Sequence, residues 1–177
     1  EVYNYQEIKK ELIEKGYSFN STSDTEVILK GYIEWGVNIL KKMIGMFAFV
    51  IHDHQKQNIF IARDRAGVKP LYYYWQDDLF LFASEIKSFH QHPEFKKNLN
   101  IDAVKLYLNY GYVPMPYCIF ESCYKLEAGH YLTIDLQNKL IYHFILSTQQ
   151  QAKTGRYRCV INLGSEKIVK NINVETI

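Results

Sequence analysis

The sequence predicts an α+β fold in which helices cover antiparallel β-sheets. Before residue 45, apolar residues recur at helical spacing. From Met46 onward, short apolar runs rich in β-branched and aromatic residues alternate with polar turns. Four such runs follow one another before residue 85, so consecutive runs are expected to pair as antiparallel strands of a sheet.

Helix signals are clearest near the start of the chain. Residues 5–15 form an amphipathic stretch that stops at Gly16. Ser23 and Glu26 fit the capping-box pattern, which predicts a second helix from Asp24. A short helix is expected at residues 85–90, and a longer one at 100–111 with Asn100 as its N-cap.

Three hairpins are predicted from paired apolar runs. The first joins residues 47–51 to 59–62, and the second joins 71–75 to 79–83. The last joins 130–134 to 139–143 around a turn at 135–138. Beyond Phe144 the pattern weakens, so residues 145–177 are expected to be a linker and a divergent tail.

Composition excludes several classes of protein. Lys and Arg number 21 against 19 Asp and Glu, and a net charge of +2 argues against a nucleic-acid surface. The longest apolar run, Gly45 to Ile51, is far shorter than the roughly 20 residues of a membrane span. The first residues also lack a signal-peptide pattern, so we expect a cytoplasmic protein with neither nucleic acid nor a membrane as partner.

No metal site is expected from the cysteines and histidines that lie close in sequence. The odd number of cysteines and their lack of Cys-x-x-Cys spacing favour reduced thiols. The pairs His52 with His54 and His90 with His92 lack a third ligand nearby, which favours solvated loop histidines.

Six segments occur in an order that is similar to one known family, the class II glutamine amidotransferase domain of glutamine-hydrolysing asparagine synthetases. Each segment is weak alone, but their common order is specific. The resemblance covers residues 1–144, which we interpret as a partial amidotransferase domain followed by the tail, with no synthetase domain. The segments are Glu1–Tyr5, Ser23–Leu29, Arg63–Tyr72, Phe82–Lys87, Gly111–Pro114 and Tyr124–Leu132.

The resemblance implies an N-terminal nucleophile hydrolase-like fold, a four-layer αββα sandwich of antiparallel sheets. It also implies an N-terminal cysteine that attacks the glutamine amide, and an Asn-Gly pair before Glu1 that stabilises the oxyanion. Neither is in the sequence, so we expect a fragment truncated at both ends, missing its first strands and inactive alone. Cys118 and Cys123 are internal and have no free α-amine, so no catalytic residue is predicted.

Two residues are expected to bind L-glutamine. The resemblance assigns Asp24 to the α-ammonium group of glutamine and Glu1 to its backbone. Asp24 has a structural interpretation as well, because an acidic residue in the first turn of a helix favours the helix dipole. ATP and Mg²⁺ are expected only for a synthetase domain, so this chain is predicted to bind no cofactor.

Other functions remain open at this point. Taken by itself, the polypeptide is better described as a non-catalytic remnant or interaction module that associates with a complementing chain or forms a homo-oligomer. It is also consistent with an amidotransferase for a different acceptor, such as a sugar metabolite. The Arg63 to Leu71 stretch is interpreted as a structural connection, because Gly67 permits a positive φ and Pro70 restricts the start of the next strand.

Overall fold

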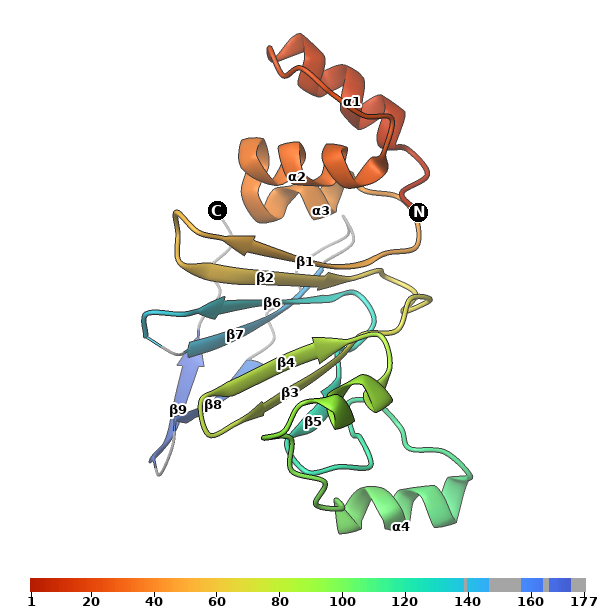
Figure 1. The fold of residues 1–177 in the computed structure, drawn as a ribbon, viewed down its shortest axis with the longest axis vertical. Coiled ribbons are helices and arrows are strands. Elements are labelled where there is room, and N and C mark those ends of the chain that lie inside the picture. The colour runs from red at the N-terminus through yellow and green to blue at the C-terminus, as the bar shows by residue number, and fades with distance from the viewer. Residues whose placement is uncertain (139, 147–156, 164–165, 173–177) are drawn as a thin grey trace.

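The computed structural model describes residues 1–138, 140–146, 157–163 and 166–172 (Figure 1). Four helical segments come first, and Ser23 caps the second by accepting a hydrogen bond from the Thr25 N–H at 3.1 Å. This confirms the predicted helix start. The segments are α1 (Tyr5–Glu14), α2 (Asp24–Trp35), η1 (Gly36–Asn38) and α3 (Ile39–Lys42).

Two antiparallel sheets follow, and all three predicted hairpins are present. The first sheet has the order β1-β2-β6-β7, and the second has the order β4-β3-β5. The first and second hairpins therefore lie in different sheets, rather than side by side in one sheet as their sequence order suggested. The strands are β1 (Ala48–Asp53), β2 (Asn58–Arg63), β3 (Tyr72–Gln76), β4 (Leu79–Ala83), β5 (Cys123–Lys125), β6 (His130–Asp135) and β7 (Leu140–Ile145).

The predicted later helices are also present. The short one is a 3₁₀ helix, η2 (Ile86–Gln91), and the longer one is α4 (Ile101–Tyr110). The Asn100 side chain accepts hydrogen bonds from two backbone N–H groups at 3.1 Å, and Gly111 ends α4 in the left-handed conformation. In the region expected to be a tail, β8 (Tyr157–Leu163) pairs antiparallel with β9 (Glu166–Ile172), where no strand was predicted.

The elements stack in layers (Figure 1). Helices α1 to α3 cover one face of the first sheet, the second sheet lies against the other face, and α4 is at the far end. This confirms the expected sandwich of two antiparallel sheets between helices. Successive side chains of β2 point to opposite faces of the first sheet, so the core has two parts. Phe60 packs against the helices, and Ile61 packs towards the second sheet.

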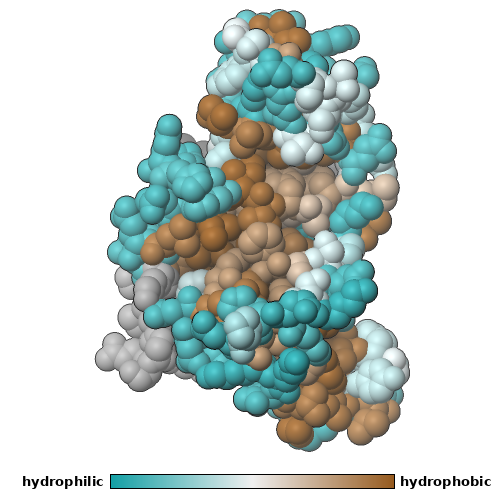
Figure 2. Space-filling model, viewed as in Figure 1, coloured by the Kyte–Doolittle hydropathy of each residue, from teal (hydrophilic) through white to brown (hydrophobic). Residues whose placement is uncertain are grey.

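Two further observations concern the surface. Among the described residues, no helix has the length and apolar content needed to cross a membrane. Helix α4 buries only Ala103 and leaves large apolar side chains exposed, among them Leu108 at 76% and Tyr110 at 64%. Figure 2 shows this apolar surface at the α4 end of the molecule.

Candidate functional site

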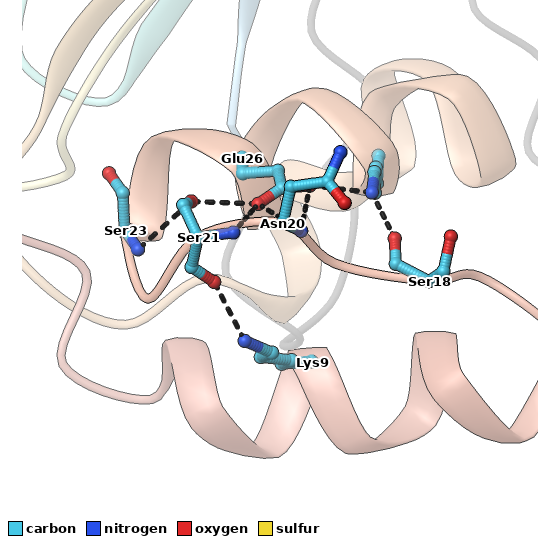
Figure 3. A network of polar contacts seen from close by, with 7 residues as sticks. Lys9, Ser18, Asn20, Ser21, Ser23 and Glu26 are labelled. Atoms are coloured by element: carbon cyan, nitrogen blue, oxygen red, sulfur yellow. Dashed lines mark hydrogen bonds and ion pairs between the residues drawn. The ribbon is translucent and has the colours of Figure 1, made fainter.

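The loop before α2 is fixed by Glu26 (Figure 3). The Glu26 carboxylate accepts hydrogen bonds from the backbone N–H groups of Asn20 and Ser21 and from Lys30 Nζ, at 2.6–3.2 Å. The Lys30 ammonium and then the Ser21 hydroxyl lower the pKa of Glu26 to about 2. The predicted capping box is only half formed, because Glu26 bonds to this loop and the Ser23 N–H donates instead to the Ser21 hydroxyl.

This loop places Asp24 at the start of α2, beside the first residues of the chain. Asp24 Oδ2 accepts a hydrogen bond from the Val2 N–H at 3.0 Å. Residues 1–3 in turn run antiparallel to 44–46, where the Met46 N–H donates to the Glu1 carbonyl at 3.0 Å. Gly45 is required there, because a Cβ atom at this position would lie 2.4 Å from the Glu1 carbonyl oxygen.

Glu1 and Asp24, the two predicted binding residues, line one cavity of about 510 Å³. Strand β1 forms a wall of this cavity, and Lys69, Pro70 and Ser84 lie across from it. A second cavity of about 530 Å³ shares the β1 wall and Ser84, and extends between the sheets to Leu71 and Phe82. The two cavities together are called the β1 groove below.

The β1 groove follows open strand edges. Strand β1 is at one edge of the first sheet as described, and β4 is at one edge of the second. Figure 2 shows apolar surface between the helical layer and the second sheet, where the groove lies. The groove therefore combines apolar walls with backbone groups of an edge strand, and two carboxylates at one end.

The groove residues that the sequence analysis missed are those of β1 itself, together with Lys69 and Ser84. Their apolar alternation predicted a strand correctly, but alternation does not show whether a strand lies at a sheet edge. The lining supplies hydroxyl groups from Thr25 and Ser84, and no cysteine is among its described residues.

Two of the three cysteines lie away from the groove. Cys118 and Cys123 are buried free thiols in the cluster beneath the second sheet, with Tyr74, Phe89 and Phe95. A hydrogen bond between the two thiols lowers the pKa of Cys118 to about 7 and raises that of Cys123. Because neither thiol lines the groove, neither is placed to attack a ligand bound there.

The Arg63 to Pro70 connection is structural, as predicted. The Arg63 guanidinium donates to the backbone carbonyls of Lys69, Gly67 and Leu126. Gly67 has a φ of +65°, and a Cβ atom there would lie 2.9 Å from the Ala128 side chain. The Arg63 guanidinium thus holds the turn that carries Lys69 and Pro70 to the groove.

Histidines were considered as metal ligands from sequence spacing alone. The rings of His52 and His54 lie 3.9 Å apart at the exposed end of β1. Among the described residues, the side chains that bring three metal-ligand atoms close together are a different set, namely Glu127, His130 and His143. None of these three lines the β1 groove.

Comparison with known proteins decides the family. A sequence-family model described as a glutamine amidotransferase domain matches residues 1–145. The chain belongs to this family. The groove, with Asp24 and Glu1, is therefore a feature of a glutamine amidotransferase domain.

Asparagine synthetases are among the relatives of this amidotransferase domain. It is 44% identical over 143 residues to the putative asparagine synthetase [glutamine-hydrolyzing] 2 of Methanocaldococcus jannaschii, covering 80% of this chain and 27% of that protein. It is 36% identical over 145 residues to asparagine synthetase [glutamine-hydrolyzing] 3 of Bacillus subtilis, covering 81% and 24%. The chain thus spans about a quarter of the length of these relatives.

Solved structures confirm the fold. The domain superimposes on the glutamine phosphoribosylpyrophosphate amidotransferase of B. subtilis with a TM-score of 0.57, at 20% identity. The match covers 84% of this chain and 28% of that one. The αββα sandwich of the N-terminal nucleophile hydrolase type, expected from the resemblance, is the fold of this amidotransferase domain.

Proposed function

We propose that this chain binds L-glutamine in the β1 groove, as the glutamine site of an asparagine synthetase-type amidotransferase. The observation that carries the proposal is the position of Asp24. Its carboxylate lines the groove and takes part in no ion pair among the described residues. A carboxylate that accepts a single backbone hydrogen bond retains the capacity to accept several more from an ammonium group.

The rest of the groove matches the rest of glutamine. A cavity of about 510 Å³ lies within the range of small-molecule sites and is ample for one amino acid. Apolar side chains of β1 and α2, including Ile28 and Phe49, provide contacts for the methylene groups. Glu1 extends the acidic end of the cavity, and we propose that it helps to hold the glutamine backbone, as the family resemblance implies.

Hydrolysis needs groups that the groove lining does not provide. Amide attack in this way requires a thiolate beside a base, and donors for the oxyanion. We propose that these come from a segment outside the 177 residues that pairs with the open edge of β1, in the same polypeptide or in a complementing chain. Ammonia would then pass to an acceptor activated by ATP and Mg²⁺ on a synthetase domain, and the names of the relatives favour aspartate as that acceptor.

The test is a titration of the chain with L-glutamine, followed by NMR or calorimetry. Loss of a charge-assisted hydrogen bond on replacing Asp24 by Asn should weaken binding by about 10- to 100-fold. Asp102→Asn is the matched control, because Asp102 also lies in the first turn of a helix but is remote from the groove. Equal glutamine affinity in the wild-type chain and the Asp24→Asn variant would contradict the proposal.

An interaction module is the second candidate, and the exposed face of α4 favours it. Four large apolar residues of this helix are at least half exposed. Such an exposed apolar surface is unusual for a short helix that has no binding partner. We propose that this face contacts a second copy of the chain. Light scattering should then show an assembly that becomes monomeric when Leu108 and Tyr110 are replaced by Ser, whereas a wild-type monomer would contradict this role.

A further inference from the structure

Glu127 in the β5–β6 loop meets His130 of β6 and His143 of β7 at one end of the first sheet. In the register of β6 and β7, Leu132 pairs with His143 and His130 pairs with Ile145. His130 and His143 therefore lie diagonally on one face of the sheet, two residues out of direct register. Their ring centroids are 4.9 Å apart.

The ligand atoms converge on one point. His130 Nε2 and His143 Nε2 lie 3.8 and 3.9 Å from the same carboxylate oxygen, Glu127 Oε2. One ligand atom from each of the three side chains lies within 4.8 Å of the others. In a tetrahedral Zn²⁺ site with bonds of about 2.0–2.2 Å, ligand atoms are roughly 3.3–3.6 Å apart. Small side-chain rotations would therefore bring these three atoms to bonding distance from a shared ion.

Direct pairing does not account for this arrangement. Separations of 3.8 and 3.9 Å between nitrogen and oxygen exceed a hydrogen bond, so neither imidazole is hydrogen-bonded to the Glu127 carboxylate. Both separations are too long for a hydrogen bond, but they are only slightly longer than the spacing between two ligand atoms of one Zn²⁺ ion. Such a cation would satisfy both imidazoles and the carboxylate at once.

A hydrogen bond to the backbone orients the His130 ring for metal binding. His130 Nδ1 lies 2.9 Å from the Ala128 carbonyl oxygen. A carbonyl can only accept, so Nδ1 carries the proton and the lone pair of neutral His130 is on Nε2, the atom that faces Glu127. Metal-binding histidines are typically oriented by such a bond from the other ring nitrogen.

From this geometry we propose that Glu127, His130 and His143 bind a divalent transition-metal ion of the Zn²⁺ class. Two imidazoles and one carboxylate suit Zn²⁺ and similar ions, whereas Mg²⁺ and Ca²⁺ favour oxygen ligands. The three side chains are 18–37% exposed, which leaves space for water as a fourth ligand. The ion ties the β5–β6 loop to β7, at the corner where the Gly129 N–H donates to the Asp64 carbonyl.

This site was not predicted from the sequence, which was expected to bind no metal. Only histidines close in sequence were considered, and His130 and His143 are brought together by the β6–β7 register. The proposal is independent of glutamine binding, because none of the three residues lines the β1 groove.

The experiment titrates the metal-free chain with Zn²⁺ in competition with a chromophoric chelator, and repeats it with Mg²⁺. We expect one Zn²⁺ ion per chain, a higher Tm with Zn²⁺, no comparable effect of Mg²⁺, and the visible absorption of tetrahedral Co²⁺ on substitution. Glu127→Gln, His130→Ala and His143→Ala should each weaken Zn²⁺ binding about tenfold or more.

The control is a chain with His52→Ala and His54→Ala, since these adjacent exposed rings are the obvious adventitious site. It should bind Zn²⁺ as tightly as the wild type. Circular dichroism of each metal-free variant checks that the fold is retained, and Glu127→Gln, which keeps the shape of the side chain, is the variant least apt to disturb it. Zn²⁺ affinity that is unchanged in the Glu127 and His143 variants, or lost in the His52/His54 control, would overturn the proposal.

Discussion

Asp64 and Asp24 both accept hydrogen bonds from backbone N–H groups, Asp64 in a turn and Asp24 at the start of a helix. They differ in how many such bonds each carboxylate accepts. Asp64 is 1% exposed and accepts three such bonds, from Ala66, Val68 and Lys69, at 2.9–3.1 Å. Asp24 is only partly buried and accepts one, while lining the β1 groove. A saturated carboxylate holds the fold, whereas a carboxylate with unused acceptor capacity beside a cavity is available to a ligand.

The largest effect on stability is expected from Asp64→Ala. The substitution leaves three N–H groups of the turn without their acceptor, so it should lower the free energy of unfolding by about 2–4 kcal/mol. Urea denaturation measures this change. Asp77→Asn is the control, because Asp77 forms an exposed pair with Lys96 and Asn tolerates its positive φ of 48°, so this variant should have little effect on stability. Similar losses in the two variants would break the distinction between saturated and surface carboxylates.

A smaller loss is expected from Gly67→Ala in the same turn. The variant combines left-handed backbone strain of about 1–2 kcal/mol with a contact at 2.9 Å to the Ala128 side chain. Gly16→Ala is the matched control, since Gly16 also has a positive φ but no atom lies within 4 Å of the added Cβ. In thermal melting, the Tm of Gly67→Ala should be lower than that of Gly16→Ala. The reverse order would show that the turn is not closely packed.

Glu26 gives a pH-dependent effect at the loop that positions Asp24. Hydrogen bonds from Lys30 and Ser21 lower the pKa of Glu26 to about 2, below its ordinary value of 4.5. Its contribution to stability is therefore complete above about pH 5 and is lost as the pH falls towards 2. The stability difference between wild type and Glu26→Gln should shrink over that interval in urea titrations. A difference that is constant from neutral pH to pH 2 would exclude this linkage.

Local signals in the sequence predicted much of this structure. Ser23 and Asn100 correctly marked the starts of α2 and α4, because an N-cap acts through neighbouring backbone groups. The polar turns between apolar runs likewise predicted the three hairpins, since a hairpin is specified within a short stretch of chain. The structural role of Gly67 followed from its freedom to adopt a positive φ.

Non-local arrangement was not predictable in the same way. That β1 and β3 belong to different sheets depends on β6 pairing with β2 and on β5 pairing with β3, far along the chain. The β1 groove exists because of this division. The meeting of His130 with His143 depends on a register in which a slip of one residue would turn one ring to the other face.

One measurement tests directly whether the Asp24 carboxylate binds the α-ammonium group of glutamine. It compares the affinities of L-glutamine and glutaramate, which is glutamine without its α-amino group, for wild-type chain and for Asp24→Asn. We predict that the wild type favours glutamine by about tenfold or more and that Asp24→Asn loses this preference, with its stability changed by less than about 1 kcal/mol because the Asn oxygen still accepts from the Val2 N–H. An unchanged preference for glutamine in a folded Asp24→Asn chain would contradict the claim.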